Sequence, residues 1–472
     1  MNPIYRTSLS VVILAAGKGK RMHSLRPKVL HEVLGKPIIQ YVIEAVKGLK
    51  PKKVVVVIGG AADEVKKQIN NKSVLFVKQK KLLGTGNAVA EAKTVLKDSK
   101  KSTILVLNGD SPLITSKTLK DFLKKHRSNK NDLSFLSFID NSSGYGRVLR
   151  NSKKNVVGIV EDRHATASEK KNIKELNGGV YAIEPEVMDY LNKLKKHVSS
   201  GEYYITDIVG IASERGKKID AYVCPSEEVR GINTRTELCQ SLEILNRKTI
   251  SGFMQRGVTF IDPSASTVHP SVSIGMDTII YPNTYLEGNT SIGRDCVIYP
   301  GSRICNSTIG NSVSVKDSTL IENSIVMNGS IIGPFAHLRL NSCIGRNVKI
   351  GNFVEIKKSV IGDGTKASHL SYIGDAIVGK NVNIGAGTIT CNYDGKRKYI
   401  TRIGSDVFIG SDSQIIAPVK IGRGAYVAAG TTVTKDVPAG ALAVSRVKQE
   451  NIKDWTIKRQ LKVKSDKLKV KK

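Results

Sequence analysis

The sequence has few of the features that mark membrane, secreted or zinc-binding proteins. No stretch of its 472 residues approaches the ~18 uninterrupted apolar residues of a membrane helix. The first apolar run, Val11–Ala16, is too short for the core of a secretory signal, and Gly17-Lys18 follows it in place of a small-residue cleavage site. The six cysteines are scattered and form no C-x-x-C pair, which argues against a disulfide framework and a zinc site. We therefore expect a cytoplasmic protein with free thiols and no membrane partner.

Aromatic and acidic residues are also scarce. Aromatics make up 5% of the chain against 40% hydrophobic residues overall, so we expect cores built of aliphatic side chains. The 41 acidic residues face 74 lysines and arginines, a formal net charge of +33. Clustered basic side chains can bind nucleic acid by releasing counterions from its backbone, but the lysines here are spread along the whole chain, so we favour a compositional bias over nucleic-acid binding. The one dense cluster is the tail, Lys458–Lys472, which we expect to be disordered and solvated.

The first half of the chain alternates short apolar runs with helical patterns. We expect strands over residues 11–14, 54–58, 74–77, 104–107 and 133–137, and helices over 38–46, 62–69, 87–96 and 117–126. This alternation predicts an α/β, Rossmann-like fold with a mostly parallel sheet covered on both faces. In such sheets ligands bind beyond the carboxyl ends of the strands.

A connecting helix is expected over residues 234–257. It opens with the capping-box pattern Thr234-x-x-Glu237, and its leucines keep helical spacing. We place the boundaries at 1–230 for the α/β domain, 231–257 for the connecting segment and 258–472 for a second domain that includes the tail.

From about residue 268 an aliphatic residue recurs every six positions, usually followed by a small residue. The series includes Leu286, Ile292, Ile298, Ile304 and, near its end, Ile403, Ile409, Ile415, Ile421, Val427 and Val433. Helices and strands do not have this period, and a β-sandwich would show a period of two. A hexapeptide repeat is typical of a left-handed parallel β-helix, whose triangular coil takes three short strands or ~18 residues. The repeat is interrupted over Thr388–Thr401, an insertion that we expect to leave the coil as a binding loop.

The stretch SVVILAAGKGKRM, Ser10–Met22, indicates a strand that runs into a phosphate-binding loop. It matches neither the Walker pattern nor G-x-G-x-x-G, yet its backbone N–H groups can form a concave anion site. Arg21 and Lys28 add cations suited to phosphoryl or nucleotidyl transfer. Asp110, at the end of an expected strand, can hold a divalent cation beside phosphate oxygens. The alternatives are a basic turn at a sheet edge and an Asp that merely caps a turn.

Taken in order, the motifs resemble those of one bacterial family. They are LAAGKGKRM with Pro27-Lys28, LGTG, GD, GYGR, IVE, GEYYITD, Gly231–Asn233, Ser368–Tyr372, NIGAGTITCNYDG and Ser445-Arg446. They are similar to those of the bifunctional N-acetylglucosamine-1-phosphate uridyltransferase and glucosamine-1-phosphate N-acetyltransferase, over roughly Ser10 to Val447. The resemblance implies an α/β nucleotidyltransferase joined to the β-helix. It further implies acetylation of glucosamine 1-phosphate by acetyl-CoA, then transfer of UMP from UTP to give UDP-N-acetylglucosamine and pyrophosphate for peptidoglycan and lipopolysaccharide precursors. It also implies Mg²⁺ and a homotrimer.

The same resemblance implies residue roles. For the uridine-nucleotide site it implies Leu14, Ala15, Ala16, Gly17, Lys28, Gln79, Gly84, Thr85, Asn108, Gly109, Asp110, Gly146, Glu161, Asn177 and Asn233. Among these, Asp110 and Asn233 would be the Mg²⁺ ligands, and Arg21 and Lys28 the catalytic cations over the phosphates. On the β-helix it implies His369 as general base, with a sugar-phosphate pocket of Arg339, Lys357, Tyr372 and Asn383. The acetyl-CoA side would be Ala386, Asn392, Tyr393, Ser411, Ala429 and Arg446.

Some positions depart from the family pattern, and two other interpretations stay open. Lys20, Asn108, Gly178 and Leu340-Asn341 stand where the family usually has other residues, but none of them removes a charge or a base that the reaction needs. One alternative is a sugar nucleotidyltransferase with a purely regulatory β-helix, which would not need His369, Tyr372 and the Asn392 loop. The other is a nucleic-acid-binding scaffold, which would leave the phosphate loop and Asp110 unexplained. A lone histidine such as His369 could also be a solvated surface residue.

Overall fold

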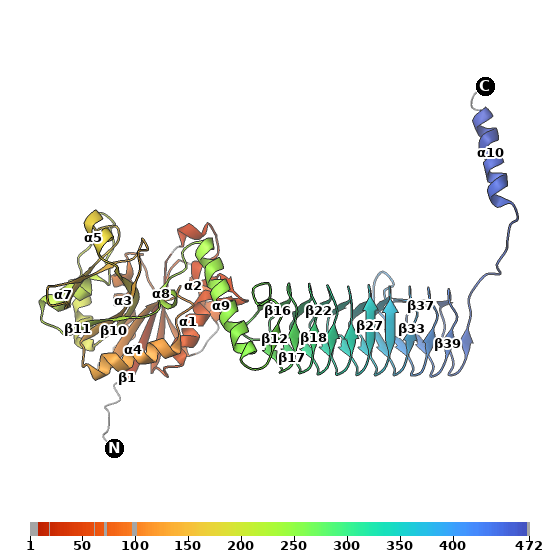
Figure 1. The fold of residues 1–472 in the computed structure, drawn as a ribbon, viewed down its shortest axis with the longest axis horizontal. Helices are drawn as coiled ribbons and strands as arrows, with labels where there is room; N and C mark the ends of the chain where they lie inside the picture. Colours follow the sequence, from red (N-terminus) through yellow and green to blue (C-terminus); the bar gives the residue numbers. More distant parts are fainter. Residues whose placement is uncertain (1–7, 18, 61, 70–72, 97–101, 470–472) are drawn as a thin grey trace, which may run out of the picture. The chain divides into compact units, whose positions relative to one another are not determined.

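The chain folds as two compact units, Met1–Thr249 and Ile250–Lys472 (Figure 1). The computed structural model describes residues 8–469 except 18, 61, 70–72 and 97–101, and of residues 464–469 it describes the backbone alone. The start of the first predicted domain (residues 1–7), the end of the second (residues 470–472) and Lys18 of the opening loop lie outside the described residues. The boundary between the units falls inside α9 (Arg235–Met254), the helix expected as a connector.

The first unit is built on a nine-stranded mixed sheet. Its main path is β11-β7-β10-β6-β1-β4-β5, and β8 (Arg147–Arg150) and β9 (Val156–Val160) lie off this path beside β10. The path strands are β1 (Ser8–Ala15), β4 (Lys53–Ile58), β5 (Val74–Lys78), β6 (Ser102–Asn108), β7 (Leu133–Ile139), β10 (Glu175–Ile183) and β11 (Ile219–Val223). The five predicted strands are all confirmed. The unpredicted β10 lies antiparallel between β6 and β7, while the other path neighbours are parallel.

Helices cover both faces of this sheet, as predicted (Figure 1). Side chains alternate along β1, so that Val11 and Ile13 pack into one core with α1 (Ile38–Lys47) and α4 (Ser116–Ser128). Val12 points to the opposite core, which contains α3 (Thr85–Lys93). The remaining helices are α2 (Ala62–Ile69), α5 (Ala167–Asn172), α6 (Pro185–Met188), α7 (Asp207–Glu214) and α8 (Ser226–Val229).

The predicted capping box at the start of α9 is confirmed. The Glu237 carboxylate accepts hydrogen bonds from the backbone N–H of Asn233 and of Thr234, and the Thr234 hydroxyl accepts one from the Glu237 N–H at 3.2 Å. Leucines on the same helix pack against a small core that includes Met22 and Ile232. The start of α9 therefore fixes the loop that carries Asn233.

The second unit is a parallel β-helix with three sheets. The first runs from β12 (Thr259–Phe260) to β41 (Leu442–Ala443), the second from β13 (Thr267–Val268) to β40 (Thr432–Val433), and the third from β14 (Ser273–Ile274) to β38 (Val419–Ile421). They contain 11, 10 and 9 strands, and their strand pairs are parallel. Ile280 pairs with Ile298 and Ile298 with Val315, so one coil takes 18 residues (280 to 298) or 17 (298 to 315). The predicted fold is confirmed.

The aliphatic residues of the hexapeptide series form the core of this β-helix. Ile298, Ile350 and Ile409 are fully buried, and one continuous cluster extends from Ile250 to Val437. Each buried aliphatic side chain contributes ~1.5–3 kcal/mol. Serine and threonine hydroxyls line the corners and donate to carbonyls one coil further along, as Ser330 does to Gly345 at 2.8 Å. These hydrogen bonds satisfy buried hydroxyls and carbonyls where the chain turns between strands.

The insertion and the tail differ in how well they were predicted. The insertion leaves between β34 (Ile389–Cys391) and β35 (Thr401–Ile403), which confirms a loop there. The expectation of a disordered tail is wrong, because Trp455–Lys469 form α10 (Figure 1). Lysine, leucine and glutamine are good helix formers, and this composition outweighs the repulsion of like charges. The described side chains of α10 are exposed, so the helix is solvated; residues 470–472 lie outside the described part.

The scarce features of the composition also have structural counterparts. All six cysteines are free, as expected. Within the described residues, the helices are too short or too polar to span a bilayer.

Candidate functional site

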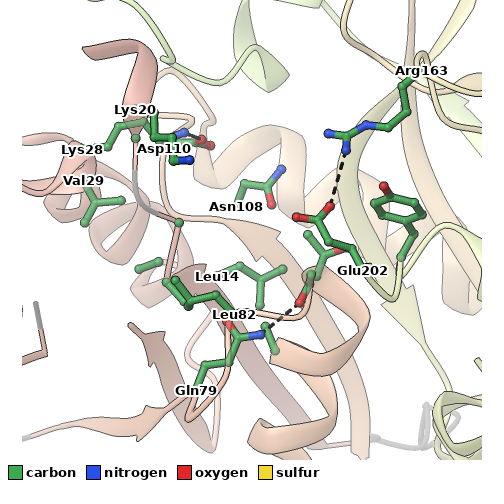
Figure 2. A pocket seen from close by; sticks show the side chains of 18 residues that line it. Leu14, Lys20, Lys28, Val29, Gln79, Leu82, Asn108, Asp110, Arg163 and Glu202 are labelled. Atoms are coloured by element: carbon green, nitrogen blue, oxygen red, sulfur yellow. Dashed lines mark hydrogen bonds and ion pairs between the residues drawn. The ribbon is translucent and has the colours of Figure 1, made fainter. Parts of the chain in front are cut away.

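A cavity of about 700 Å³ opens at the carboxyl ends of β1, β5 and β6 (Figure 2). Ten residues implied for the nucleotide site line it: Leu14, Ala15, Ala16, Gly17, Lys28, Gln79, Gly84, Thr85, Asn108 and Asp110. They come from the loop after β1, the loop after β5 and the end of β6. The cavity therefore lies where the strand pattern places a ligand site in an α/β sheet.

Two glycines let the backbone close around this cavity. Gly19 has a φ of +60°, and a Cβ there would lie 2.7 Å from Cβ of Lys28. Gly84 has a φ of +93°, and a Cβ there would lie 2.5 Å from the Tyr203 carbonyl oxygen. Buried Gln79 fixes the second loop, because its side-chain amide donates to the Gly84 carbonyl at 3.1 Å and to Asn87 at 2.8 Å. The glycines therefore allow both loops to take the conformations that form the walls of this cavity.

The two implied metal ligands lie at one end of the cavity. Lys28 forms an ion pair with Asp110, and its Nζ also lies 3.0 Å from Oδ1 of Asn233. The second carboxylate oxygen of Asp110 is buried, with no hydrogen-bond partner among the described residues. A Cβ on Gly231 would lie 2.9 Å from that oxygen, so the glycine lets the Asn233 loop approach it.

This donor set fits a hard divalent cation. One carboxylate and one amide oxygen are the hard ligands that Mg²⁺ takes when phosphate and water oxygens complete its shell. The described residues contain no group of three or more His, Cys, Asp and Glu side chains that could hold a metal by themselves. A cation at Asp110 and Asn233 would therefore depend on the nucleotide for its remaining ligands.

Other implied residues surround the cavity without lining it. Asn177 donates to the Tyr181 hydroxyl at 2.6 Å, and a Cβ on Gly179 would lie 2.5 Å from the Asn108 amide nitrogen. Glu161 accepts a hydrogen bond from Thr206 at 2.7 Å, and burial raises the pKa of its carboxyl. Gly146 and Gly109 occupy close-packed positions: a Cβ at Gly146 would lie 2.8 Å from Ile159, and the Gly109 N–H donates to the Leu14 carbonyl.

Arg21 is placed differently from the expectation. It lies on a short 3₁₀ helix, Lys20–Met22, with its side chain exposed, and Lys20 lines the cavity in its place. Lys20 and Arg21 are adjacent basic residues of the same motif, so the sequence alone does not predict which of the two side chains faces the cavity.

Sequence reasoning also missed one wall of the cavity. Arg163, Glu202 and Tyr204 also line it, and Arg163 pairs with Glu202 at 3.8 Å. Figure 2 shows Arg163 and Glu202 across the cavity from Lys28 and Asp110. The signal was present, because IVE lies two residues before Arg163 and GEYYITD contains the other two residues. The resemblance assigns a role to Glu161 of IVE but none to Arg163, Glu202 or Tyr204.

A second group of implied residues meets on adjacent coils of the β-helix. Arg339 in β25 (His337–Arg339) pairs in register with Lys357 in β28 (Glu355–Lys357), and Tyr372 begins the next strand, β31 (Tyr372–Gly374). Asn392, at the start of the insertion loop, lies 3.5 Å from the Tyr372 hydroxyl. Arg339, Lys357, Tyr372 and Asn392 are therefore brought together from four coils.

Lys357 is a buried ammonium among charged neighbours. Its Nζ lies 3.5 Å from Asp375. The pKa of Lys357 is raised, mainly by its hydrogen bond with Lys398 and further by the negative charge of Asp375. The pKa of Lys398 is lowered because Lys357 lies beside it. This crowding of positive charge suits an anionic ligand.

His369 lies around the corner from Tyr372. It ends β30 (Lys366–His369) on the first sheet, and its Nδ1 lies 2.6 Å from Oδ1 of Asn352, its partner on the preceding coil. With Nδ1–H donating to this oxygen, Nε2 keeps its lone pair and the ring is exposed to a ligand. Asn383 lies one coil further along the same sheet, beside Lys366.

The residues implied for acetyl-CoA form a column along one corner. The Ala386 carbonyl accepts a hydrogen bond from Asp412 and the Ser411 carbonyl one from Gly430, so Ala386, Ser411 and Ala429 follow one another coil by coil. A Cβ on Gly430 would lie 3.7 Å from Cδ of Arg446, which extends the column. Tyr393 is exposed on the insertion loop and donates to the Gly395 carbonyl at 2.6 Å.

Both units match known protein families. Residues 10–227 match the nucleotidyl transferase family, 259–342 the GMPPB C-terminal domain, and 400–435 six bacterial transferase hexapeptide repeats. Together with the cavity and the β-helix, these matches define a nucleotidyltransferase joined to a left-handed β-helical hexapeptide transferase.

Relatives match along almost the whole chain. It is 48% identical over 454 residues to the bifunctional protein GlmU of Thermodesulfovibrio yellowstonii, covering 96% of this chain and 100% of that protein. It is 46% identical to the GlmU of Acetivibrio thermocellus and 45% identical to that of Clostridium botulinum strain 657, covering 96% and 95% of this chain and 98% of each relative. The chain therefore belongs to the bifunctional GlmU family, and the predicted bifunctional transferase is confirmed. Nucleotidyl transferases of this family generally use a divalent metal.

Proposed function

We propose that the enzyme acetylates glucosamine 1-phosphate with acetyl-CoA and then transfers UMP from UTP to the product. The second step yields UDP-N-acetylglucosamine, a precursor of peptidoglycan and lipopolysaccharide, and pyrophosphate. The observation that carries the proposal is the gathering of the charged groups at two places, around Lys28 and Asp110 in one unit and around Lys357 and Asn392 in the other. We place the enzyme in the cytoplasm, where UTP and acetyl-CoA are made.

In the acetyl transfer, His369 acts as the general base. Its free Nε2 takes a proton from the sugar amine as the nitrogen attacks the thioester carbonyl, while the Asn352 side chain holds Nδ1–H. The N–C bond forms, the C–S bond breaks, and CoA leaves as a thiol once its sulfur has received a proton. Arg339 and Lys357 hold the sugar phosphate, and Tyr372 and Asn383 hold the sugar.

The column of Ala386, Ser411, Ala429 and Arg446 then serves acetyl-CoA. It runs along the corner that follows the Asn383 strand, and the insertion loop with Asn392 and Tyr393 leaves from the next sheet. This arrangement supports a binding place for the thioester donor beside the base.

In the uridylyl transfer, a phosphate oxygen of N-acetylglucosamine 1-phosphate attacks the α-phosphorus of UTP. A P–O bond forms, the bond between the α-phosphorus and the bridging oxygen breaks, and pyrophosphate leaves with the β and γ groups. Lys28 neutralises charge on the phosphates, and we assign the same role to Arg21 of the adjoining exposed turn. We assign Glu161 and Asn177 to the sugar hydroxyls, as acceptor and donor.

We assign the divalent ion of this step to Mg²⁺. Asp110 and Asn233 would hold it, and the ion supplies charge neutralisation on the triphosphate when bound. The buried, unpartnered oxygen of Asp110 supports this assignment.

We also propose a homotrimer. Ile325, Val360 and Ile377 form an exposed apolar column on the outer face of the third sheet, each between 40% and 48% exposed. An exposed apolar column of this kind favours burial against another copy of the chain. The match of residues 400–435 to bacterial transferase hexapeptide repeats also supports the trimer.

One experiment tests the assignment of both activities. The purified full-length protein is given acetyl-CoA and glucosamine 1-phosphate, and free thiol is measured; in a separate reaction it is given UTP, Mg²⁺ and N-acetylglucosamine 1-phosphate, and pyrophosphate is measured. We expect both products. Pyrophosphate without thiol would instead support a regulatory β-helix.

A further inference from the structure

Asp375 is a buried carboxylate between the two halves of the candidate acetyl-transfer site. It follows β31 at a corner of the β-helix with a φ of +48°, and 6% of its surface is exposed. Its Oδ2 accepts a hydrogen bond from the Asn392 amide at 2.6 Å and lies 3.5 Å from Nζ of Lys357. Nζ of Lys358 lies 3.8 Å from its other oxygen.

The fold does not need a charge at this corner. Residues such as Asn283, Asn306 and Asn341 occupy positive-φ corners elsewhere in the same β-helix. The backbone of Asp375 already makes the coil-to-coil hydrogen bonds, since its N–H donates to Lys357 and its carbonyl accepts from Thr401. Burying a carboxylate is costly unless it is paired, so the side chain is best explained by its contacts. Besides the exposed Lys358, these are the Lys357 ammonium and the Asn392 amide.

Those two groups belong to different subsites. Lys357 lies in the sugar-phosphate pocket, whereas Asn392 begins the insertion loop on the acetyl-CoA side. The Asn392 amide also lies 3.5 Å from the Tyr372 hydroxyl, which is a weaker contact than the 2.6 Å bond to Asp375. Lys357 also contacts Lys398 of the same loop, but the two side chains carry like charge. The carboxylate is therefore the attractive contact between the lysine and the loop.

We propose that Asp375 is a positioning residue for acetyl transfer: it holds Lys357 in the sugar-phosphate pocket and ties the start of the insertion loop to it. The proposal rests on the acetyl-transfer function proposed above. It predicts that Asp375 affects the reaction only through these two partners.

The test is a double-mutant cycle on acetyl transfer. Wild-type, Asp375→Asn, Lys357→Met and the double variant are assayed for thiol release, with kcat and KM measured for each substrate. Asp375→Asn keeps the shape and an oxygen for Asn392 but removes the charge. We expect kcat/KM for glucosamine 1-phosphate to fall about 10- to 100-fold, mostly through KM, as for the loss of one charge-assisted contact. In the Lys357→Met background the same change should lower kcat/KM by less than about 3-fold, because the two act as one unit.

Controls separate positioning from folding. Asp295→Asn makes the same change at a positive-φ corner several coils away and should leave acetyl transfer unchanged. Uridylyl transfer should stay normal in every variant. If Asp375→Asn does not fold, Asp375→Glu takes its place: it keeps the charge but displaces it by one methylene, and it should show the same rise in KM and the same loss of effect with Lys357→Met.

The outcomes are distinguishable. Normal acetyl transfer in the Asp375 variants of an active enzyme would overturn the positioning role alone, and so would effects that multiply in the double variant. A wild-type protein that releases no thiol would overturn the proposed acetyl transfer, and the role of Asp375 with it.

Discussion

The substitution His369→Ala gives the sharpest test of the acetyl-transfer site. His369 is exposed, and its ring forms a hydrogen bond with Asn352 at 2.6 Å, so the change removes a ring from the surface and leaves the aliphatic core intact. We expect the variant to fold and to keep its denaturation midpoint close to that of the wild type. An effect on the reaction can then be assigned to chemistry.

The magnitude follows from what the imidazole does. A general base contributes a factor of ~10²–10⁴ to the rate, which corresponds to ~3–5 kcal/mol in the barrier at 1.36 kcal/mol per factor of ten. We expect kcat for thiol release to fall by that factor. KM for glucosamine 1-phosphate should change little, because Arg339 and Lys357 remain in place.

The assay follows thiol release at two pH values and pyrophosphate release at one. Raising the pH deprotonates the substrate amine in solution, so acetyl transfer by the variant should recover in part, while pyrophosphate release from supplied N-acetylglucosamine 1-phosphate should stay normal. Near wild-type acetyl transfer at neutral pH would remove His369 from the mechanism. Loss of both activities in a folded variant would refute the division of the chain into two independent sites.

Four further outcomes are expected. Asp110→Asn should abolish pyrophosphate release and spare thiol release, because the cation site serves one unit; parallel loss of both in a folded protein would contradict this. Truncation after Glu450 should leave uridylyl transfer unchanged in the pyrophosphate assay, since the described side chains of α10 are exposed. Ile356→Ala should lower the free energy of unfolding by ~2–5 kcal/mol in urea denaturation, because Ile356 is fully buried. Burial raises the pKa of the Glu161 carboxyl above its value in the unfolded chain, so ionisation of this group destabilises the folded protein as pH rises through the folded pKa. Glu161→Gln should therefore raise the denaturation midpoint more at pH 8 than at pH 5. Equal shifts at the two pH values would refute this.

The parts predicted well are those encoded by local sequence. The inward position of each hexapeptide is set by its own coil, so Ile298 or Ile409 could be assigned to the core from spacing alone. The strands β1 and β6 are continuous apolar runs, as buried parallel strands usually are. By contrast β10, ELNGGVYAI, has a pair of glycines in its middle, where its pairing with β7 shifts register, and this break conceals its strand pattern.

The parts that were missed depend on residues brought together from afar. Arg163 and Glu202 form the far wall of the nucleotide cavity although 39 positions separate them (163 to 202). Asp375 is an ordinary corner residue in sequence, and its importance appears only when Lys357 and Asn392 are seen on either side of it. No local pattern encodes such contacts, because the partners lie far apart in the sequence.

The β-helix explains how one coil can acquire a binding loop without disturbing the others. Pairing between Val378 and Ile403 spans 25 residues (378 to 403), whereas the next pairing, between Ile403 and Ile421, spans 18 (403 to 421). The ladder thus returns to its register immediately after the insertion, because each coil contacts only its neighbours. Arg339 and Lys357 stand on adjacent strands about 4.8 Å apart, a spacing that the ladder fixes before any substrate arrives. The ladder therefore sets the spacing of these two cations, and Asp375 contacts both Lys357 and Asn392, at the start of the insertion.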